Sequence, residues 1–567
     1  MKEDEKKVID GVEKPGVKRR DFMVGTAATV ASISLTGGMS AMFGGCGKVG
    51  SGAEFDIIIK GGTIYDGTAA EPIVGDIGIK GDKIIAIGEI LGSAGRVINA
   101  AGLIVTPGFI DVHTHCDLTF KRLGFKKNLA YILPSFKGNY NYVCQGVTTV
   151  VTGNCGYGYT DVDHWLKLVD RVGFGTNVYH LVPHGIVREE LFGNDQPGEL
   201  TADQLDAMKK KVAQAMEMGA VGMSTGLEYA PGFHSTTEEL IELSKVVREH
   251  GGIYTTHMRD ESGKIYEDGQ FGVVKSIKEA ARIGEEAEIP VEISHLKASA
   301  PLNNIKAEKI LNEIERARSS GLDITADQYP YAAGSTDITI LIPNEFKVTD
   351  GVKDEFKTAE GRKEIKKAIN EVFTYSGPDK TLITMMYEGN EDYEGKTLAE
   401  IAEIEGKDPA DVYVELVCDM KAPMGVFFAQ SEEIVRDLMP NDYVMTISDG
   451  WTIPKGMTKP HPRLYGTFPR KLGRYVMEDK IMDLKSAIVS MTSQPAGKFG
   501  LKGRGKIEVG AFADVVVLDI NKVMDNATYL DPHQYPNGIL YSTVNGVLAV
   551  DNGVATGDRG GRGLRRS

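Results

Sequence analysis

The chain has 567 residues, of which 42% are hydrophobic and 25% charged, and its formal net charge is -15. At roughly 150 residues per domain this length exceeds one simple core, and the composition is that of a globular protein rather than a disordered or membrane-embedded one. The negative charge argues against a nucleic-acid partner, because a phosphate backbone requires a basic protein face. We therefore expect a multidomain globular protein that does not bind nucleic acid.

Residues 1–46 are typical of an export signal rather than of a folded domain. Lys18-Arg19-Arg20 ends a charged segment, and a weakly apolar stretch rich in Ala, Ser, Thr and Gly follows it. The Arg-Arg-x-Phe order resembles a twin-arginine signal, which directs export. A membrane-anchoring helix is the alternative, but the stretch is too polar for a good membrane span. We expect a periplasmic or cell-surface protein.

Cys46 closes this segment in the sequence Phe43-Gly44-Gly45-Cys46, which resembles a lipoprotein cleavage site with Phe where Leu is usual. A short motif of this kind leaves two alternatives open: a lipid-carrying cysteine that attaches the protein to a membrane, or an ordinary cysteine. The chain has five cysteines, an odd and sparse set for an exported protein, so a disulfide scaffold is not expected.

The two ends of the main body have strand character. Within residues 54–105, the segment 76–88 alternates apolar and polar residues around a Gly-Asp turn, which is a hairpin pattern. Strand-like sequence returns in residues 494–556. We expect these two segments to form one small β-domain, followed by a flexible Gly/Arg-rich tail at 557–567.

Residues 106–493 alternate short apolar strands with segments of helical spacing. The strand candidates are 104–113, 147–155, 177–183, 221–226, 253–257, 291–295, 323–328 and 444–448. The helical candidates are 128–144, 161–172, 201–217, 237–249, 273–287 and 304–319. Eight β-units of this kind predict an α/β fold, a parallel (β/α)8 barrel. Residues 340–440 break the rhythm and predict an insertion between strands seven and eight, which could form a lid.

Chemically reactive side chains follow several of these strands, at the barrel end where catalytic residues gather. His113 and His115 stand two residues apart after the first strand, so both imidazoles point to the same face. Further candidates close later strands: Cys155, His257, His295 and Asp449. Each one alone has an ordinary structural explanation. Together the six predict a site for a divalent metal such as zinc, which binds His, Cys and Asp.

Longer motifs resemble a known family over most of residues 54–550. They are Pro107–His115, Gly153–Gly156, Ser224–Tyr229, Ser294–Lys297, Tyr329–Thr336 and His461–Arg470. On these motifs the chain resembles the amidohydrolase superfamily and, within it, the N-acyl-D-amino-acid deacylases, or D-aminoacylases. A cysteine ligand is the distinguishing mark of that group, whereas related cyclic amidases commonly bridge two metals with a carboxylated lysine.

The resemblance implies a tightly bound zinc on Cys155, His257 and His295, with one coordination position left for water. The His113/His115 pair would form with Asp449 a second position, weaker or vacant. Zinc would lower the pKa of water toward about 7. Asp449 would be the catalytic residue that takes the water proton and delivers it to the leaving amine.

The same resemblance implies a substrate and the residues that bind it. The substrate is an N-acyl-D-amino acid, hydrolysed to a carboxylate and a free D-amino acid. Its carboxylate and pocket would be formed by Tyr229, Lys297, Tyr329, Ser335 and Arg463. Arginine suits this role because its planar guanidinium matches a carboxylate with two hydrogen bonds. The preference for D over L substrates rests on the resemblance alone.

Two other readings of the barrel stay open. One is an amidohydrolase acting on cyclic amides, as hydantoinases do, or on dipeptides; Cys155 argues against the lysine-bridged cyclic amidases. The other is a small-ligand binding protein on a degenerate barrel. Such a protein would be expected to have lost metal ligands, whereas all six candidates are present. The sequence does not predict the side-chain or acyl-group preference, nor the oligomeric state.

Overall fold

The computed structural model describes residues 53–122, 133–193, 196, 198–299, 303–348, 351–387 and 389–566. The chain divides into two compact units, Met1–Ser51 and Gly52–Ser567, and the fold described is that of the second. The predicted export signal and Cys46 therefore lie outside the described residues. Within the described ranges, no helix combines the length and apolar character needed to cross a membrane.

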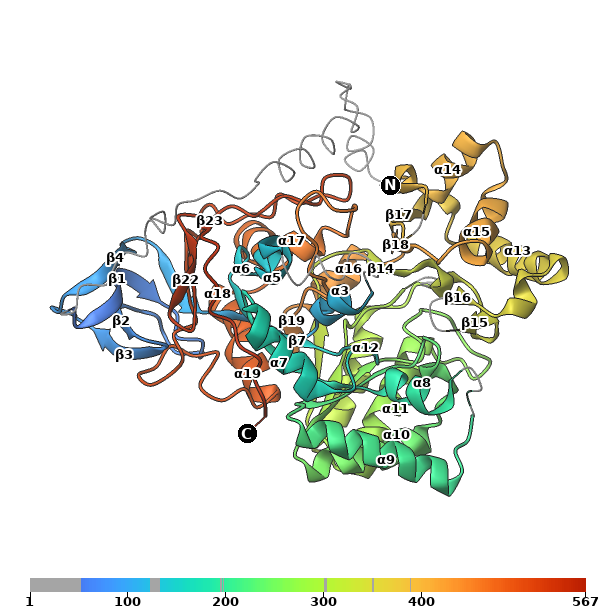
Figure 1. The fold of residues 1–567 in the computed structure, drawn as a ribbon, viewed down its shortest axis with the longest axis horizontal. Helices are drawn as coiled ribbons and strands as arrows, with labels where there is room; N and C mark the ends of the chain where they lie inside the picture. Colours follow the sequence, from blue (N-terminus) through green and yellow to red (C-terminus); the bar gives the residue numbers. More distant parts are fainter. Residues whose placement is uncertain are drawn as a thin grey trace, which may run out of the picture. The chain divides into compact units, whose positions relative to one another are not determined.

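A nine-stranded sheet joins the two ends of the second unit, with the N-terminal strands in blue beside the C-terminal strands in red (Figure 1). Its strands, in order across the sheet, are β23 (Val554–Ala555), β22 (Val547–Asp551), β21 (Ile539–Val544), β20 (Val515–Leu518), β5 (Ile104–Pro107), β1 (Phe55–Ile64), β2 (Ile73–Lys80) and β3 (Lys83–Gly88), with β4 (Ala94–Asn99) paired to β1. The antiparallel pairing of β5 with β20 makes the connection. A buried cluster of Ile, Val and Ala from both ends forms its core. The fold class predicted from sequence includes this shared sheet.

The barrel strands form two parallel sheets. The first contains β6 (Phe109–Asp111), β7 (Val147–Thr152) and β8 (Asn177–His180); the second contains β9 (Val182–Pro183), β10 (Gly222–Gly226), β11 (Ile253–His257), β12 (Val291–Ile293), β13 (Ile324–Gln328) and β19 (Val444–Thr446). Val221 N–H donates to the His180 carbonyl at 2.9 Å, joining the sheets on one side. A parallel bridge between Thr114 and Gly450 joins them on the other. The strands thus follow the (β/α)8 order, without one continuous closed ladder.

Helices alternate with these strands, five of them in segments where the sequence predicted helical spacing. The helices are α7 (Val162–Val172), α8 (His184–Phe192), α9 (Ala202–Glu217), α10 (Thr237–Glu249), α11 (Gly272–Ala287), α12 (Ala307–Ser319), α16 (Glu432–Leu438) and α18 (Leu484–Met491). Short helices α3 (Cys116–Arg122), α17 (Arg463–Arg470) and α19 (Ser493–Lys498) complete this part, with a π-helical segment at Lys471–Glu478. Their apolar faces and the strands share one buried core.

Two sequence predictions about the barrel are corrected. The expected first strand 104–113 breaks at Gly108, so that its first half belongs to the nine-stranded sheet and its second half to the barrel. A Cβ at Gly108 would lie 2.1 Å from Thr148 Oγ1, which is why this close crossing requires glycine. The described part of the expected helix 128–144 contains only α5 (Pro134–Lys137) and α6 (Tyr140–Val143). Asn139, at φ 47°, separates them.

The predicted insertion lies between β13 and β19, the seventh and eighth barrel strands, and has its own buried core. Its elements are β14 (Gly334–Asp337), β15 (Lys347–Val348), β16 (Gly351–Val352), α13 (Ala359–Phe373), β17 (Thr381–Met385), α14 (Leu398–Glu405), α15 (Pro409–Cys418) and β18 (Met424–Phe427). It begins earlier than residue 340, because β14 already pairs with β18. The chain has returned to the barrel by α16, which contacts α12.

The prediction of a flexible C-terminal tail is wrong. Val178 N–H donates to the Arg562 carbonyl at 2.9 Å, and Leu564 N–H donates to the Val178 carbonyl at 2.8 Å. Glycine permits this close approach, since a Cβ at Gly563 would lie 2.2 Å from the Leu166 carbonyl oxygen. Composition alone suggested a frayed terminus, but the glycines let the backbone lie against β8 and α7.

Candidate active site

All six predicted metal ligands are buried and come together at the C-terminal ends of the barrel strands. They follow four different sections of the barrel wall: β6, β7, the adjacent pair β11 and β12, and β19. Because parallel strands end at the same side of a barrel, residues far apart in the sequence meet there. Asp449 N–H donates to the His113 carbonyl at 3.0 Å, which ties the last strand end to the first.

Three of these donors lie close enough together to hold one zinc ion, at distances on either side of those in a tetrahedral site. Cys155 Sγ is 3.9 Å from His257 Nδ1 and 3.5 Å from His295 Nε2, and the two nitrogens are 3.0 Å apart. In a tetrahedral zinc site, bond lengths of about 2.0–2.3 Å separate neighbouring ligand atoms by about 3.3–3.6 Å. The donor set of one thiolate and two imidazoles is also typical of zinc.

The remaining donors form an adjoining group on the other side of the thiol. His113 Nε2 is 3.3 Å from Cys155 Sγ and 3.7 Å from Asp449 Oδ1. His115 Nε2 is 3.1 Å from the same carboxylate oxygen. His113, His115 and Asp449 thus form a second group that can hold a metal ion, and Cys155 also lies close enough to His113 and His295 to share an ion with them.

Three of the ligands have an unusual backbone conformation. The φ angles of Cys155, His295 and Asp449 are 54°, 36° and 49°, in the left-handed region that non-glycine residues rarely adopt. Each such residue costs about 1–3 kcal/mol and is found mainly at functional sites, where the surrounding structure imposes it. The strand ends therefore turn sharply here, and three donors are directed into one cluster.

The charges in the cluster favour an ionised thiol and an ionised carboxylate, and the same neighbours raise the pKa of the His113, His115 and His257 imidazoles. Burial raises the pKa of the Cys155 thiol, but the imidazoles around it, His113 first, lower it by more, so the net shift is well below the ordinary value. Burial likewise raises the pKa of Asp449, while Arg463 and the imidazoles outweigh it and lower the pKa overall. A thiolate and an ionised carboxylate are the forms that bind metal and accept protons.

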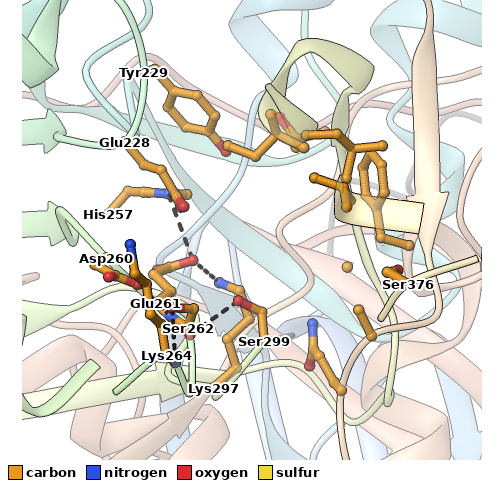
Figure 2. Close-up of a pocket in the computed structure, with 18 of the residues that line it drawn as sticks. Glu228, Tyr229, His257, Asp260, Glu261, Ser262, Lys264, Lys297, Ser299 and Ser376 are labelled. Atoms are coloured by element: carbon orange, nitrogen blue, oxygen red, sulfur yellow. Dashed lines mark hydrogen bonds and ion pairs between the residues drawn. The ribbon is translucent and has the colours of Figure 1, made fainter. Parts of the chain in front are cut away.

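Three carboxylates that the sequence reasoning missed surround the imidazoles. Asp327, at the end of β13, lies 3.5 Å from His113 Nδ1 and accepts a hydrogen bond from the His295 backbone N–H. Glu261 lies 3.1 Å from His295 Nδ1. Glu228 lies 3.1 Å from His257 Nε2, and Figure 2 shows these two side chains close together. Such partners fix the orientation of a ligating imidazole. A signal existed for Asp327, because it also ends a barrel strand.

The five predicted substrate-binding residues all line cavities that reach this cluster. A cavity of about 80 Å³ is bordered by His115, Cys155 and Asp449, and an adjoining one of about 390 Å³ extends outward under the insertion. The substrate-binding candidates on their walls are Tyr229, Lys297, Tyr329, Ser335 and Arg463. Figure 2 shows the larger cavity, with Glu228, Tyr229 and His257 on one side and Ser376 of the insertion on the other.

Lys297 and Arg463, the two cationic residues of this set, differ in how fully their N–H groups are hydrogen-bonded. Lys297 forms an ion pair with Glu261, which raises the pKa of the lysine although burial alone would lower it. Arg463 uses only Nη2, which lies 2.9 Å from Asp449 Oδ2 and donates to the Ser335 carbonyl at 3.1 Å. Its Nε and Nη1 are buried and have no hydrogen-bond partner among the described residues. These two N–H groups lie on different edges of the guanidinium, so a ligand that reached them would accept single hydrogen bonds rather than a bidentate pair.

Known proteins match this chain along most of its length. Amidohydrolase family models match residues 104–390 and 424–550. A D-aminoacylase from Alcaligenes xylosoxydans xylosoxydans is 34% identical over 90% of this chain and 98% of its own. A solved N-acyl-D-glutamate deacylase from Bordetella bronchiseptica is 31% identical to this chain, with a TM-score of 0.75, and the match covers 90% of this chain and 99% of the other. That structure contains zinc and a phosphonate mimic of the tetrahedral intermediate.

A solved D-aminoacylase is 33% identical to this chain, with a TM-score of 0.74, and the match covers 90% of this chain and all of the other. That protein has a binuclear metal centre and is described as activated by one metal and attenuated by a second. The barrel, with His, Cys and Asp donors gathered at its strand ends, defines a metal-dependent amidohydrolase. Within that class, the chain belongs to the D-aminoacylase family of amide hydrolases.

Proposed function

We propose that this protein hydrolyses the amide bond of N-acyl-D-amino acids with one tightly bound zinc, held by Cys155, His257 and His295. The observation that carries the proposal is the zinc-compatible spacing of these three donors beside an ionised Asp449. Zinc bound there would lower the pKa of water toward about 7 and polarise the substrate carbonyl. His113 and His115 would form, with Asp449, the weaker second position.

Asp449 would transfer the proton in this reaction. Because its lowered pKa keeps the carboxylate ionised, it can accept a proton from the attacking water. His115 holds one carboxylate oxygen at 3.1 Å and Arg463 holds the other at 2.9 Å, which fixes its orientation. The same carboxyl then delivers the proton to the leaving nitrogen, because an amine anion is too poor a leaving group.

The unpartnered N–H groups of Arg463 support its role in binding the substrate carboxylate. Its Nε and Nη1 lack acceptors among the described residues, and this cationic side chain lines the cavity beside the metal ligands. Tyr329 supports the guanidinium, whose carbon lies 4.7 Å from the centre of the tyrosine ring. Lys297 is better suited to hold Glu261 and the His295 ring in place, since its ammonium is already paired.

The test combines metal analysis with a stereochemical screen. Purified protein is expected to contain about one zinc per chain and to release D-amino acids from N-acetyl-D-alanine, N-acetyl-D-methionine and similar substrates. Cys155→Ala is expected to lose the zinc, whereas His115→Asn is expected to keep it. Activity confined to L substrates, or to hydantoins, would overturn the proposal. A protein without zinc or amidase activity would instead favour a binding protein on a degenerate barrel.

We further propose that residues 1–46 direct export by a twin-arginine route to the periplasm or cell surface. The pair Arg19-Arg20 before an apolar stretch supports this. Replacing both arginines by lysine should keep the protein in the cytoplasmic fraction. Labelling with a fatty-acid analogue, with Cys46→Ala as the control, shows whether this cysteine carries a lipid. Export without labelling would leave Cys46 as an ordinary cysteine.

A further inference from the structure

The larger cavity has room for more than a short acyl group and a small side chain. Its volume of about 390 Å³ falls in the range of about 300–1,000 Å³ found for sites that enclose drug-sized ligands. The barrel contributes one wall, including Glu228 and Lys297, and the insertion contributes the other, including Leu341 and Tyr375. The chemistry of the insertion wall therefore bears on which substrate the enzyme accepts.

Most charged groups around this cavity are already paired with one another. Arg259 is held by Glu279 at 2.9 Å, and Lys297 by Glu261. Asp449 is held by Arg463. Each of these three cations is matched by a neighbouring carboxylate, which largely neutralises its charge.

Two lysines that line the larger cavity form no ion pair among the described residues: Lys264 is exposed, whereas Lys347, in β15 of the insertion, is buried. It is only 5% exposed and lines both the larger cavity and the smaller one beside the metal ligands. Its ammonium donates to Asn344 Oδ1 at 2.9 Å. Within the part of the chain that the structure describes, no carboxylate lies within ion-pair distance of this ammonium.

An unpaired buried ammonium is unfavourable in the folded protein, so a compensating role is expected. Burial lowers the pKa of Lys347 to about 8, although Glu228, Asp337 and Glu345 raise it in part. The group therefore still carries its charge at neutral pH. An anion from the cavity would supply the missing partner, and its hydrogen bond to the ammonium would be strengthened by the charge on both groups.

We propose that Lys347 binds a second carboxylate of the substrate, beyond the one held by Arg463, and so selects N-acyl-D-amino acids with an additional anionic group. The inference rests on the proposed function. The second carboxylate can belong to the D-amino-acid side chain or to the acyl group, because Lys347 lines both the smaller cavity beside the metal ligands and the larger outer one.

The experiment compares pairs of substrates that differ in one charge. N-acetyl-D-glutamate is compared with N-acetyl-D-glutamine, and N-succinyl-D-alanine with N-succinamoyl-D-alanine, using the zinc-loaded enzyme. The wild type is expected to prefer the acid in one pair by about tenfold or more in kcat/KM, mainly through KM, and that pair identifies the source of the carboxylate. Equal rates within both pairs would overturn the proposal.

The variants separate binding from general electrostatics. Lys347→Met is expected to remove the preference while changing kcat/KM for the amides by no more than about twofold, and Lys347→Arg should retain it. Lys264→Met is the matched control, because Lys264 lines the same cavity but is exposed. A loss by Lys347→Met that is equal for acids and amides would show that Lys347 only balances nearby carboxylates, and would also overturn the proposal.

Two further outcomes are distinguishable. If the wild type cleaves N-acetyl-D-alanine but shows no preference within either pair, the deacylase function stands and the role of Lys347 fails. If it cleaves no N-acyl-D-amino acid, the proposed function itself fails. If Lys347→Met does not fold, the substrate pairs are measured with the wild type and Lys347→Arg. A Lys347→Arg variant that is fully active on the amides but shows no kcat/KM preference for the acid would then count against the proposal.

Discussion

The metal cluster and the outer cavity differ in the kinds of residue that form them and in how fully their charges are paired. The cluster consists of buried donors on barrel strand ends, each held by a neighbouring carboxylate, imidazole or guanidinium. The outer cavity is half enclosed by the insertion, whose wall includes Ile340, Leu341, Tyr375 and the unpaired Lys347. The barrel thus supplies the metal donors and Arg463, and the insertion supplies the outer wall of the cavity, where active-site loops on other barrels adjust substrate preference.

The largest effect is expected at Asp449. Asp449→Asn removes the proton acceptor but keeps the size of the side chain, so kcat should fall by about 10²–10⁴-fold or more, while the tight zinc remains. Steady-state kinetics and zinc quantification on the same preparation measure both quantities. Near-normal turnover would mean that another residue transfers the proton. The assignment of the reaction to the metal cluster would then no longer rest on Asp449.

A smaller effect is expected one step outside the ligands, at Glu261. This carboxylate contacts His295 at 3.1 Å and pairs with Lys297, so Glu261→Gln should loosen the imidazole and weaken zinc binding by about 10–100-fold. Competition with a zinc chelator measures the affinity. Saturating zinc should restore most of the activity, as expected for a positioning residue. Unchanged zinc affinity would show that Glu261 does not contribute to metal binding through His295.

A still smaller and more selective effect is expected on the insertion wall. Tyr375 is 46% exposed at the edge of the outer cavity. Tyr375→Ala should leave kcat for N-acetyl substrates within about twofold and raise KM several-fold for bulkier acyl groups, because only those reach this wall. The ratio of kcat/KM between short and long acyl groups is the readout. A matching loss for N-acetyl substrates would mean that the insertion also takes part in the reaction.

No effect on activity is expected at Lys471, a buried lysine that lines none of the cavities around the metal cluster. Burial lowers its pKa to about 7 from 10.5, and its ammonium donates to Thr446 and Ser490 hydroxyls. Between pH 10.5 and about 7 the lysine is protonated in the unfolded chain but neutral in the folded protein. The free energy of unfolding therefore decreases as pH falls toward 7. Lys471→Met should therefore raise Tm more at pH 6 than at pH 9. An equal gain at both pH values would show that the lysine is not titrating.

Lys347 and Lys471 are both buried, yet the sequence around them does not distinguish their surroundings. One lies in an insertion strand beside a cavity, and the other packs between β19 and α18. Local spacing predicted the β-units, the helices α7 and α9 to α12, and the strand-end positions of the six donors, because each depends on residues close together in the chain. It could not predict Glu261 or Glu228 as partners of the imidazoles, since that role depends on how separate loops meet.

The sequence by itself determined the class of fold and the chemical identity of the donors, because hydrophobic periodicity fixes strands and helices, and parallel strands must end on one side of a barrel. Tertiary structure alone decided the break at Gly108, the position of the C-terminal tail against β8, and the charge left unpaired at Lys347. These features depend on close approach between distant segments. Backbone crossings, hydrogen bonds and ion pairs of this kind leave no periodic pattern in the chain.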